Sequence, residues 1–152
     1  MKKLLFVCVL MVFGLMLGCA TTQTTETKAA PAYAFVILPS MAVDVPVAGG
    51  QKVTFNRGEV LKKALMDEYK GQASVVEGQP VAGAIIVEPR LTEIWKRSDV
   101  VKEGVAAANV NGKWIAGYYG EVDGEIDAKD AKIKVEGAAA EFAKKVRAEI
   151  AP

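Results

Sequence analysis

Histidine is absent from this 152-residue chain, and cysteine occurs only twice, at Cys8 and Cys19. Without histidine, neither a Ser-His-Asp nor a Cys-His catalytic arrangement can form. The sequence also lacks the G-x-G-x-x-G and P-loop motifs that bind phosphate groups. We therefore expect no enzymatic activity, no cofactor and no metal ion.

An excess of either charge is also missing. Only two of the 19 basic residues, Lys2 and Lys3, precede Cys19, which leaves 17 basic residues against all 18 acidic ones in the rest of the chain. A near-neutral domain lacks the basic surface that binds the phosphates of nucleic acid. We therefore expect no nucleic-acid partner.

The longest hydrophobic run covers residues 4–17 and follows two lysines. A positive start, a short apolar run and a small residue are typical of a secretory signal peptide, and the run is short for a membrane span. We predict a signal peptide over residues 1–18, with Cys8 discarded inside it.

The end of this run, Met16-Leu17-Gly18-Cys19, resembles the lipobox of bacterial lipoproteins, although Met16 stands where leucine is usual. The resemblance implies that Cys19 is lipidated and anchors the protein to a membrane, and Ala20 implies the outer membrane, facing the periplasm. Two or more acyl chains anchor durably, because each buried methylene contributes about 0.8 kcal/mol. The alternative is a plain signal peptide or an uncleaved anchor, in which Cys19 has no role.

Residues 20–32, with the sequence ATTQTTETKAAPA, have no apolar periodicity. Such a segment buries too little surface to offset its ordering entropy. We therefore predict a lipidated cysteine and flexible tether over residues 19–32, followed by one domain over residues 33–152.

The first half of this domain contains strand, helix and strand signals. The apolar run 33–38 predicts a buried strand, residues 40–50 predict a loop, and residues 73–77 predict a second strand, parallel to the first. Residues 57–70 predict an amphipathic helix that Asn56 caps and Gly71 ends.

Antiparallel strands are predicted next. Residues 83–95 read as a strand with Pro89 at an edge or a bulge, and Asn111-Gly112 is a hairpin signal between two strands. Residues 131–135 predict a further strand, and residues 138–150 predict a closing helix after a break at Gly137. The expected fold is α+β, a mixed, mostly antiparallel sheet with two helices packed on one face, in the order β-α-β-β-β-β-α.

Alternation along the strand after Asn111-Gly112 predicts its two faces. Trp114 and Tyr118 share the apolar register and are interpreted as core. The opposite register carries Tyr119 and a run of acidic residues, namely Glu121, Asp123, Glu125 and Asp127. Carboxylates can bind calcium, but this spacing is that of a solvated strand face and not of a calcium loop. The strand either continues as one long bulged strand or ends in a three-residue loop that pairs Val122 with Ile126.

Exposed large aromatic residues mark interaction surfaces, so Trp95 and Tyr119 are the candidate partner-binding residues. The order of elements after the lipobox resembles that of small periplasmic lipoproteins similar to the TolB N-terminal domain and to the penicillin-binding-protein activator LpoB. This resemblance implies a non-catalytic binding or assembly module with an envelope protein partner. The alternative is an auxiliary ligand-binding component of an envelope transport system, and a hydrolase is the third hypothesis.

Overall fold

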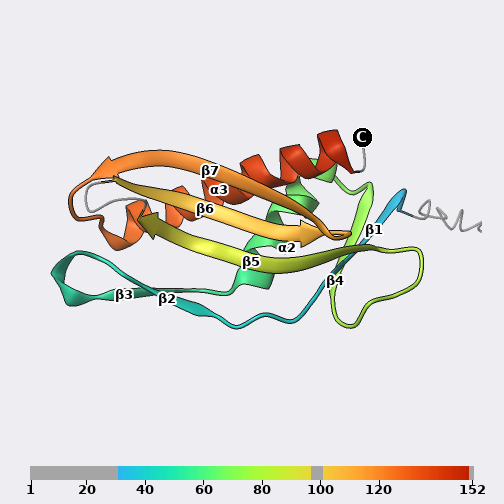
Figure 1. Ribbon diagram of the computed structural model, residues 1–152, viewed down its shortest axis with the longest axis horizontal. Helices are drawn as coiled ribbons and strands as arrows, with labels where there is room; N and C mark the ends of the chain where they lie inside the picture. The colour runs from blue at the N-terminus through green and yellow to red at the C-terminus, as the bar shows by residue number, and fades with distance from the viewer. Residues whose placement is uncertain (1–30, 97–100, 151–152) are drawn as a thin grey trace, which may run out of the picture. The chain divides into compact units, whose positions relative to one another are not determined.

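The computed structural model describes residues 31–96 and 101–150 (Figure 1). The predicted signal peptide, Cys19 and residues 20–30 of the predicted tether lie outside the described residues. Within the described ranges, no helix is both long enough and apolar enough to span a membrane.

The centre of the domain is a five-stranded mixed sheet in the order β4-β1-β5-β6-β7. β1 runs parallel to both of its neighbours, β4 and β5, and the parallel pairing with β4 was predicted. β6 pairs antiparallel with β5 on one side and with β7 on the other. The strand bounds are β1 Tyr33–Ile37, β4 Ala73–Glu77, β5 Ile85–Lys96, β6 Val101–Val110 and β7 Lys113–Asp123.

Two helices, α2 (Arg57–Tyr69) and α3 (Ala128–Glu149), pack on one side of this sheet (Figure 1). Their apolar side chains join those of the strands in one buried core that includes Phe35, Leu65 and Phe142. The predicted α+β class, with a mixed sheet and two helices, is confirmed.

The local signals of α2 are confirmed. The Asn56 side chain accepts a hydrogen bond from the Glu59 amide at 3.2 Å and so caps the first turn. The helix ends where Lys70 adopts a left-handed conformation and donates its amide to the Met66 carbonyl at 3.1 Å, and Gly71 continues in positive φ.

The loop predicted over residues 40–50 is wrong, because part of it forms a hairpin with the residues that follow. β2 (Val43–Pro46) pairs antiparallel with β3 (Lys52–Phe55). Apolar side chains of this hairpin pack against residues at the start of α3 and just before it, and together they form a second core. From the hairpin and the residue after β2 this core contains Val45, Val47, Val53 and Phe55, and from the α3 region it contains Ile126, Ala131 and Val135. The alternating valines were a strand signal that the glycines and proline obscured.

The strand predicted over residues 131–135 is also wrong, because α3 already begins at Ala128. Asp127 caps it, accepting a hydrogen bond from the Asp130 amide at 2.7 Å. Gly137 does not break the helix, and the ring of Tyr119 occupies the space that a side chain at Gly137 would need.

The hairpin between β6 and β7 is confirmed, with Asn111 and Gly112 both at positive φ. The register of β5 shifts between Pro89 and Leu91, which confirms the bulge predicted at the proline. A second bulge at Gly120 lets β7 continue to Asp123, so the long, bulged strand is the correct alternative.

Candidate partner-binding surface

The structure reverses the predicted faces of β7. Ile115 and Gly117 are buried, whereas Trp114 is 50% exposed and Tyr118 is 48% exposed. The interpretation of Trp114 and Tyr118 as core residues is therefore wrong.

The reversal follows from the close approach of α3 to the sheet. A Cβ atom on Gly117 would overlap the backbone of Ala138 and Phe142, and one on Gly104 would overlap the carbonyl of Lys134. Only residues without a side chain fit at these two positions. The helix therefore covers the face that carries these two glycines, and Trp114 and Tyr118, in the other register, lie on the open face.

Cross-strand pairs define this open face. Tyr118 lies opposite Val105, Ala116 lies opposite Ala107, and Trp95 lies opposite Glu103. Paired residues of neighbouring strands project from the same side of a sheet. We call the resulting surface the aromatic face, which consists of Leu91, Trp95, Val105, Ala107, Trp114, Ala116 and Tyr118.

Within the aromatic face, small and large residues alternate. Val105 and Ala107 are almost completely buried in β6, whereas the rings of Trp114 and Tyr118 stand on β7 at either side of Ala116. Aromatic rings supply a large contact area together with a polar N–H or O–H group. The aromatic face therefore presents two large rings, Trp114 and Tyr118, on either side of a shallow area formed by Ala107 and Ala116.

A lysine from α3 occupies part of the free edge of β7. Lys145 Nζ donates a hydrogen bond to the Ala116 carbonyl at 2.9 Å and lies 5.8 Å from the centroid of the Tyr118 ring. A lysine at a sheet edge hinders pairing with another strand, and its charge attracts the ring. A partner is therefore expected to bind the side chains of the aromatic face and not to pair as a strand with the free edge of β7.

The two predicted partner-binding residues do not lie together. Trp95 is 38% exposed and belongs to the aromatic face, at the end of the sheet far from Trp114. Tyr119 projects from the opposite face, where its ring contacts α3 at Gly137. Sequence reasoning missed Trp114 and Tyr118, although the glycines at 104 and 117 were a signal for the position of the helix.

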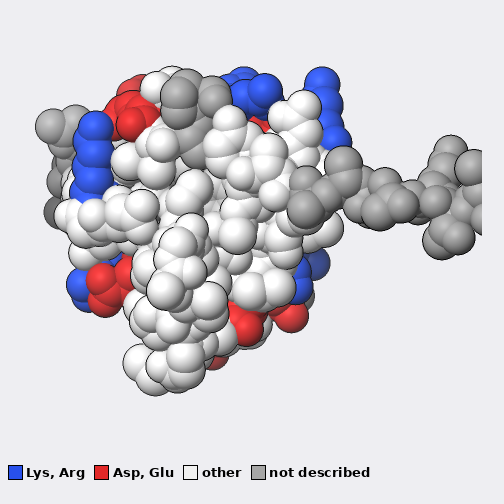
Figure 2. All heavy atoms as spheres, turned by 90° about the vertical axis from the view of Figure 1, so that its right-hand side faces the viewer, with Lys and Arg blue, Asp and Glu red and all other residues white. Residues whose placement is uncertain are grey.

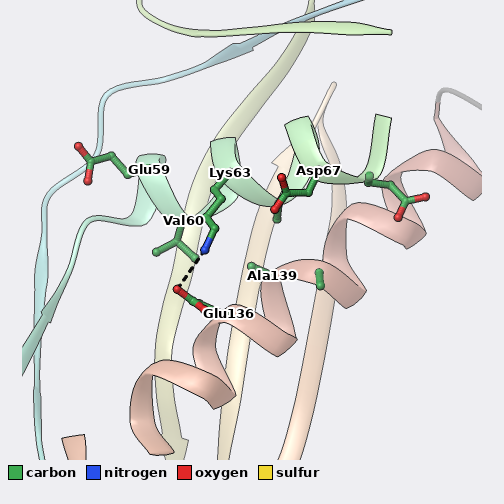
Figure 3. A pocket seen from close by; sticks show the side chains of 9 residues that line it. Glu59, Val60, Lys63, Asp67, Glu136 and Ala139 are labelled. Atoms are coloured by element: carbon green, nitrogen blue, oxygen red, sulfur yellow. Dashed lines mark hydrogen bonds and ion pairs between the residues drawn. The ribbon is translucent and has the colours of Figure 1, made fainter. Parts of the chain in front are cut away.

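A groove of about 520 Å³ separates α2 from α3 on the outer surface of the helix layer (Figure 3). Lys63 Nζ lies 3.4 Å from Glu136 Oε1 across it, and Figure 3 shows the Glu59 carboxylate pointing away from this pair. All the residues that line the groove come from the two helices: Glu59, Val60, Lys63, Ala64, Asp67, Glu68, Glu136, Ala139 and Ala140. The groove therefore lies outside the packed interior between helices and sheet.

The acidic residues around the end of β7 are spread over different elements. Glu121, Glu125 and Asp127 are exposed, and the Asp127 carboxylate caps α3. Among residues 31–96 and 101–150, no group of three or more acidic or thiol side chains is placed to hold a metal ion.

Comparisons with known proteins give little beyond the geometry. No family model matches the chain, and no curated protein matches it. One solved structure, of an uncharacterized protein, is 20% identical over 76% of this chain and 89% of its own, with a TM-score of 0.39. A second, from Xanthomonas campestris and of the family DUF330, is 10% identical over 78% of this chain and 85% of its own, also with a TM-score of 0.39.

Proposed function

We propose that this protein is a lipid-anchored cell-envelope protein that binds an envelope protein partner, without catalysis, through its aromatic face. The observation that carries the proposal is the half-exposure of Trp114 and Tyr118 on a sheet face that no helix of the described chain covers. Contiguous exposed apolar surface of this kind marks interaction sites.

The composition of the aromatic face supports a protein partner. Residues that carry binding energy at protein interfaces are enriched in tryptophan and tyrosine, which lose little rotamer freedom on binding. Glu88 and Glu93 lie in the same register as Trp114 and Tyr118 respectively, so acidic groups border the apolar centre on β5. Both glutamates already pair with arginines, Glu88 with Arg90 at 2.8 Å and Glu93 with Arg57 at 3.8 Å. A partner with an apolar patch and a polar rim of both charges matches this arrangement.

The location is proposed from the N-terminal sequence. The lipobox resemblance at Cys19 and the polar segment after it support an outer-membrane anchor that faces the periplasm. The similarity in element order to TolB N-terminal and LpoB-like lipoproteins supports an assembly role at the same site.

A second candidate function is the binding of a small ligand, as an auxiliary component of an envelope transport system. The groove between α2 and α3 favours it, because about 520 Å³ is within the range of small-molecule sites. Its lining carries four carboxylates and one lysine, so a cationic ligand with a small apolar part suits it. Replacing Ala140, an exposed residue of the groove lining, with Trp should obstruct the groove and abolish such binding without touching the aromatic face or the core.

The test of the main proposal is photocrosslinking in intact cells. A photoreactive phenylalanine analogue at position 118 should form a protein adduct, and the same analogue at Ile133, an exposed position on α3, should not. Adducts at position 133 alone would contradict the proposal. Cys19→Ser tests the anchor separately, because the variant should leave the membrane fraction, and a cleaved variant that stays there would contradict lipidation.

A further inference from the structure

One end of the domain, which we call the uncharged end, collects segments that are far apart in the sequence. The Asn111 amide donates a hydrogen bond to the Ile86 carbonyl at 2.9 Å, which places the β6–β7 turn beside the start of β5. β1 and β4 also begin there, since Tyr33 pairs with Ala73. The members of this end are therefore the start of β1, the loop of residues 78–84 before β5, the β6–β7 turn and Trp114.

Two charged residues lie at this end, Lys113 beside the β6–β7 turn and Glu149 of α3, and they form an ion pair with each other at 2.6 Å. Other charged residues are rare in these segments. Glu77 is the only one between residues 71 and 87, and residues 78–87 contain none. Viewed end on, the domain shows uncharged atoms at the centre, with lysine, arginine, aspartate and glutamate towards the margins (Figure 2). The apolar side chains that face solvent here include Val81, which is 60% exposed.

The loop that carries Val81 connects β4 to β5, and this connection does not require an exposed valine. β4 and β5 lie on either side of β1 and run parallel to it, so residues 78–84 must cross β1. The Gly78 amide donates a hydrogen bond to the Ile37 carbonyl at 3.0 Å, which fixes the start of the crossing. Val36 on β1 is buried, whereas Val81 in the loop is mostly exposed to solvent. Val81 is therefore free to contact an apolar surface outside the domain.

The chain enters the domain at the same end. Pro31 and Ala32 directly precede Tyr33, so the segment that leads back to Cys19 starts beside the loop of residues 78–84. The thirteen residues 20–32 span at most about 43 Å when fully extended. Acyl chains on Cys19 would thus tether the domain to the bilayer from its uncharged end.

We propose that the uncharged end rests on the phospholipid bilayer that holds Cys19, with Val81 and Trp114 in the headgroup region. This inference rests on the proposed lipid anchor. A surface with few charges can enter the interface at little desolvation cost, and here Lys113 and Glu149 neutralise each other in an ion pair. Tryptophan is favoured there because its ring is apolar and its N–H is polar. The long strands then stand away from the membrane and present the aromatic face sideways to a partner.

The two tryptophans of the chain can report this orientation, because they lie at different distances from the uncharged end. Trp114 lies beside the turn at the uncharged end, whereas Trp95 is in register with Glu103 and Glu121 near the other end of β7. Seven residue steps along a strand separate the two levels by about 20 Å. Both side chains belong to the aromatic face, so they differ mainly in their distance from the proposed membrane contact.

The experiment uses the full, lipidated chain reconstituted into vesicles of phosphatidylethanolamine and phosphatidylglycerol that contain a nitroxide-labelled lipid. Trp95→Phe leaves Trp114 as the fluorophore, and Trp114→Phe leaves Trp95. We expect strong quenching of Trp114 and little quenching of Trp95. Equal quenching of both, as for a domain lying flat on its aromatic face, or quenching of neither would overturn the orientation.

Matched substitutions test the contact itself. Val81→Asp should abolish most of the Trp114 quenching, whereas Ile133→Asp, which places the same charge on an exposed apolar position of α3 near Gly104, should leave it unchanged. Circular dichroism confirms that each variant is folded. Vesicle flotation is measured first: failure to float contradicts the lipid anchor and both proposals, and flotation without Trp114 quenching overturns the orientation alone.

Discussion

The two faces of the β5–β7 sheet differ in how closely a helix approaches them. The face beneath α3 carries Gly104, Ala106 and Gly117, and the open face carries Trp95, Trp114 and Tyr118. A helix buries more contact when its backbone can approach the strands closely, and small residues permit this approach. The close approach of α3 at Gly104 and Gly117 therefore distinguishes the covered face from the open face.

This difference also separates stability from binding. Residues of the covered face are buried and their replacement should disturb the fold. Residues of the aromatic face are half-exposed, so their replacement should affect a partner more than the fold. The predictions below test this separation, from the largest expected change in the free energy of unfolding to the smallest.

Phe142→Ala should destabilise the domain by about 3 to 5 kcal/mol, because Phe142 is fully buried between α3 and the sheet. Trp114→Ala removes a larger ring but should cost about 1 kcal/mol or less, since half of that ring is in solvent. Urea denaturation of the two variants measures both values. Similar losses would show that the aromatic face is part of the core.

Gly117→Ala should destabilise the domain by about 3 kcal/mol, because the new Cβ would overlap the backbone of α3 and force the helix away from β7. The matched control is Ala116→Val, one residue earlier on the open face, which should change stability by about 0.5 kcal/mol or less. If Gly117→Ala proves neutral in thermal unfolding, the helix does not lie as close as described.

Tyr69, on α2, supplies a test at alkaline pH. Burial raises the pKa of Tyr69 from 10.0 to about 12. The unfolded chain therefore loses this proton first, so the contribution is intact below pH 10 and is lost as pH rises towards 12, by about 2 kcal/mol in total. Relative to Tyr69→Phe, the wild type should lose this additional stability in urea unfolding between pH 9 and pH 12. A constant difference between the two proteins would indicate that the hydroxyl is solvated.

The smallest effect concerns Gly137 and the Tyr119 ring that covers it. Replacing glycine by alanine inside a helix usually stabilises by about 1 kcal/mol, but here the methyl group would meet the ring. Gly137→Ala should thus give no gain in the wild type and a gain of about 1 kcal/mol in a Tyr119→Ala background. A double-mutant cycle measures this coupling, and additive effects of the two substitutions would show that residues 119 and 137 do not interact.

The elements with strong local signals could be predicted from the sequence. Asn56 at the start of α2, Asn111-Gly112 in the turn and Pro89 at the bulge each act on the backbone within a few residues, so no tertiary information was needed. The β2–β3 hairpin and the first turns of α3 were mispredicted because each is stabilised by burial against the other. Local pattern alone gave these segments the wrong type.

The candidate site was harder to predict, because both registers of β7 carry apolar residues between positions 114 and 119, and the bulge at Gly120 moves Glu121 to the face opposite Tyr119. Alternation separates the two registers but does not say which of them the helix covers. That choice depends on the glycine and alanine residues of two strands, which become neighbours only in the sheet. Trp95 and Tyr119 were identified from their residue type, and both are exposed, at 38% and 48%. That they lie on opposite faces could not be foreseen, because Gly137, which the Tyr119 ring covers, lies on a distant helix.

The central claim, that the aromatic face is covered by a partner in the envelope, is tested most directly by cysteine labelling. Ala116→Cys places a thiol at the centre of the aromatic face, and Ile133→Cys places one on exposed α3. In purified protein both should react with a small maleimide. In intact cells the account predicts that position 116 is protected while position 133 still reacts; equal reactivity of the two positions in cells would contradict it.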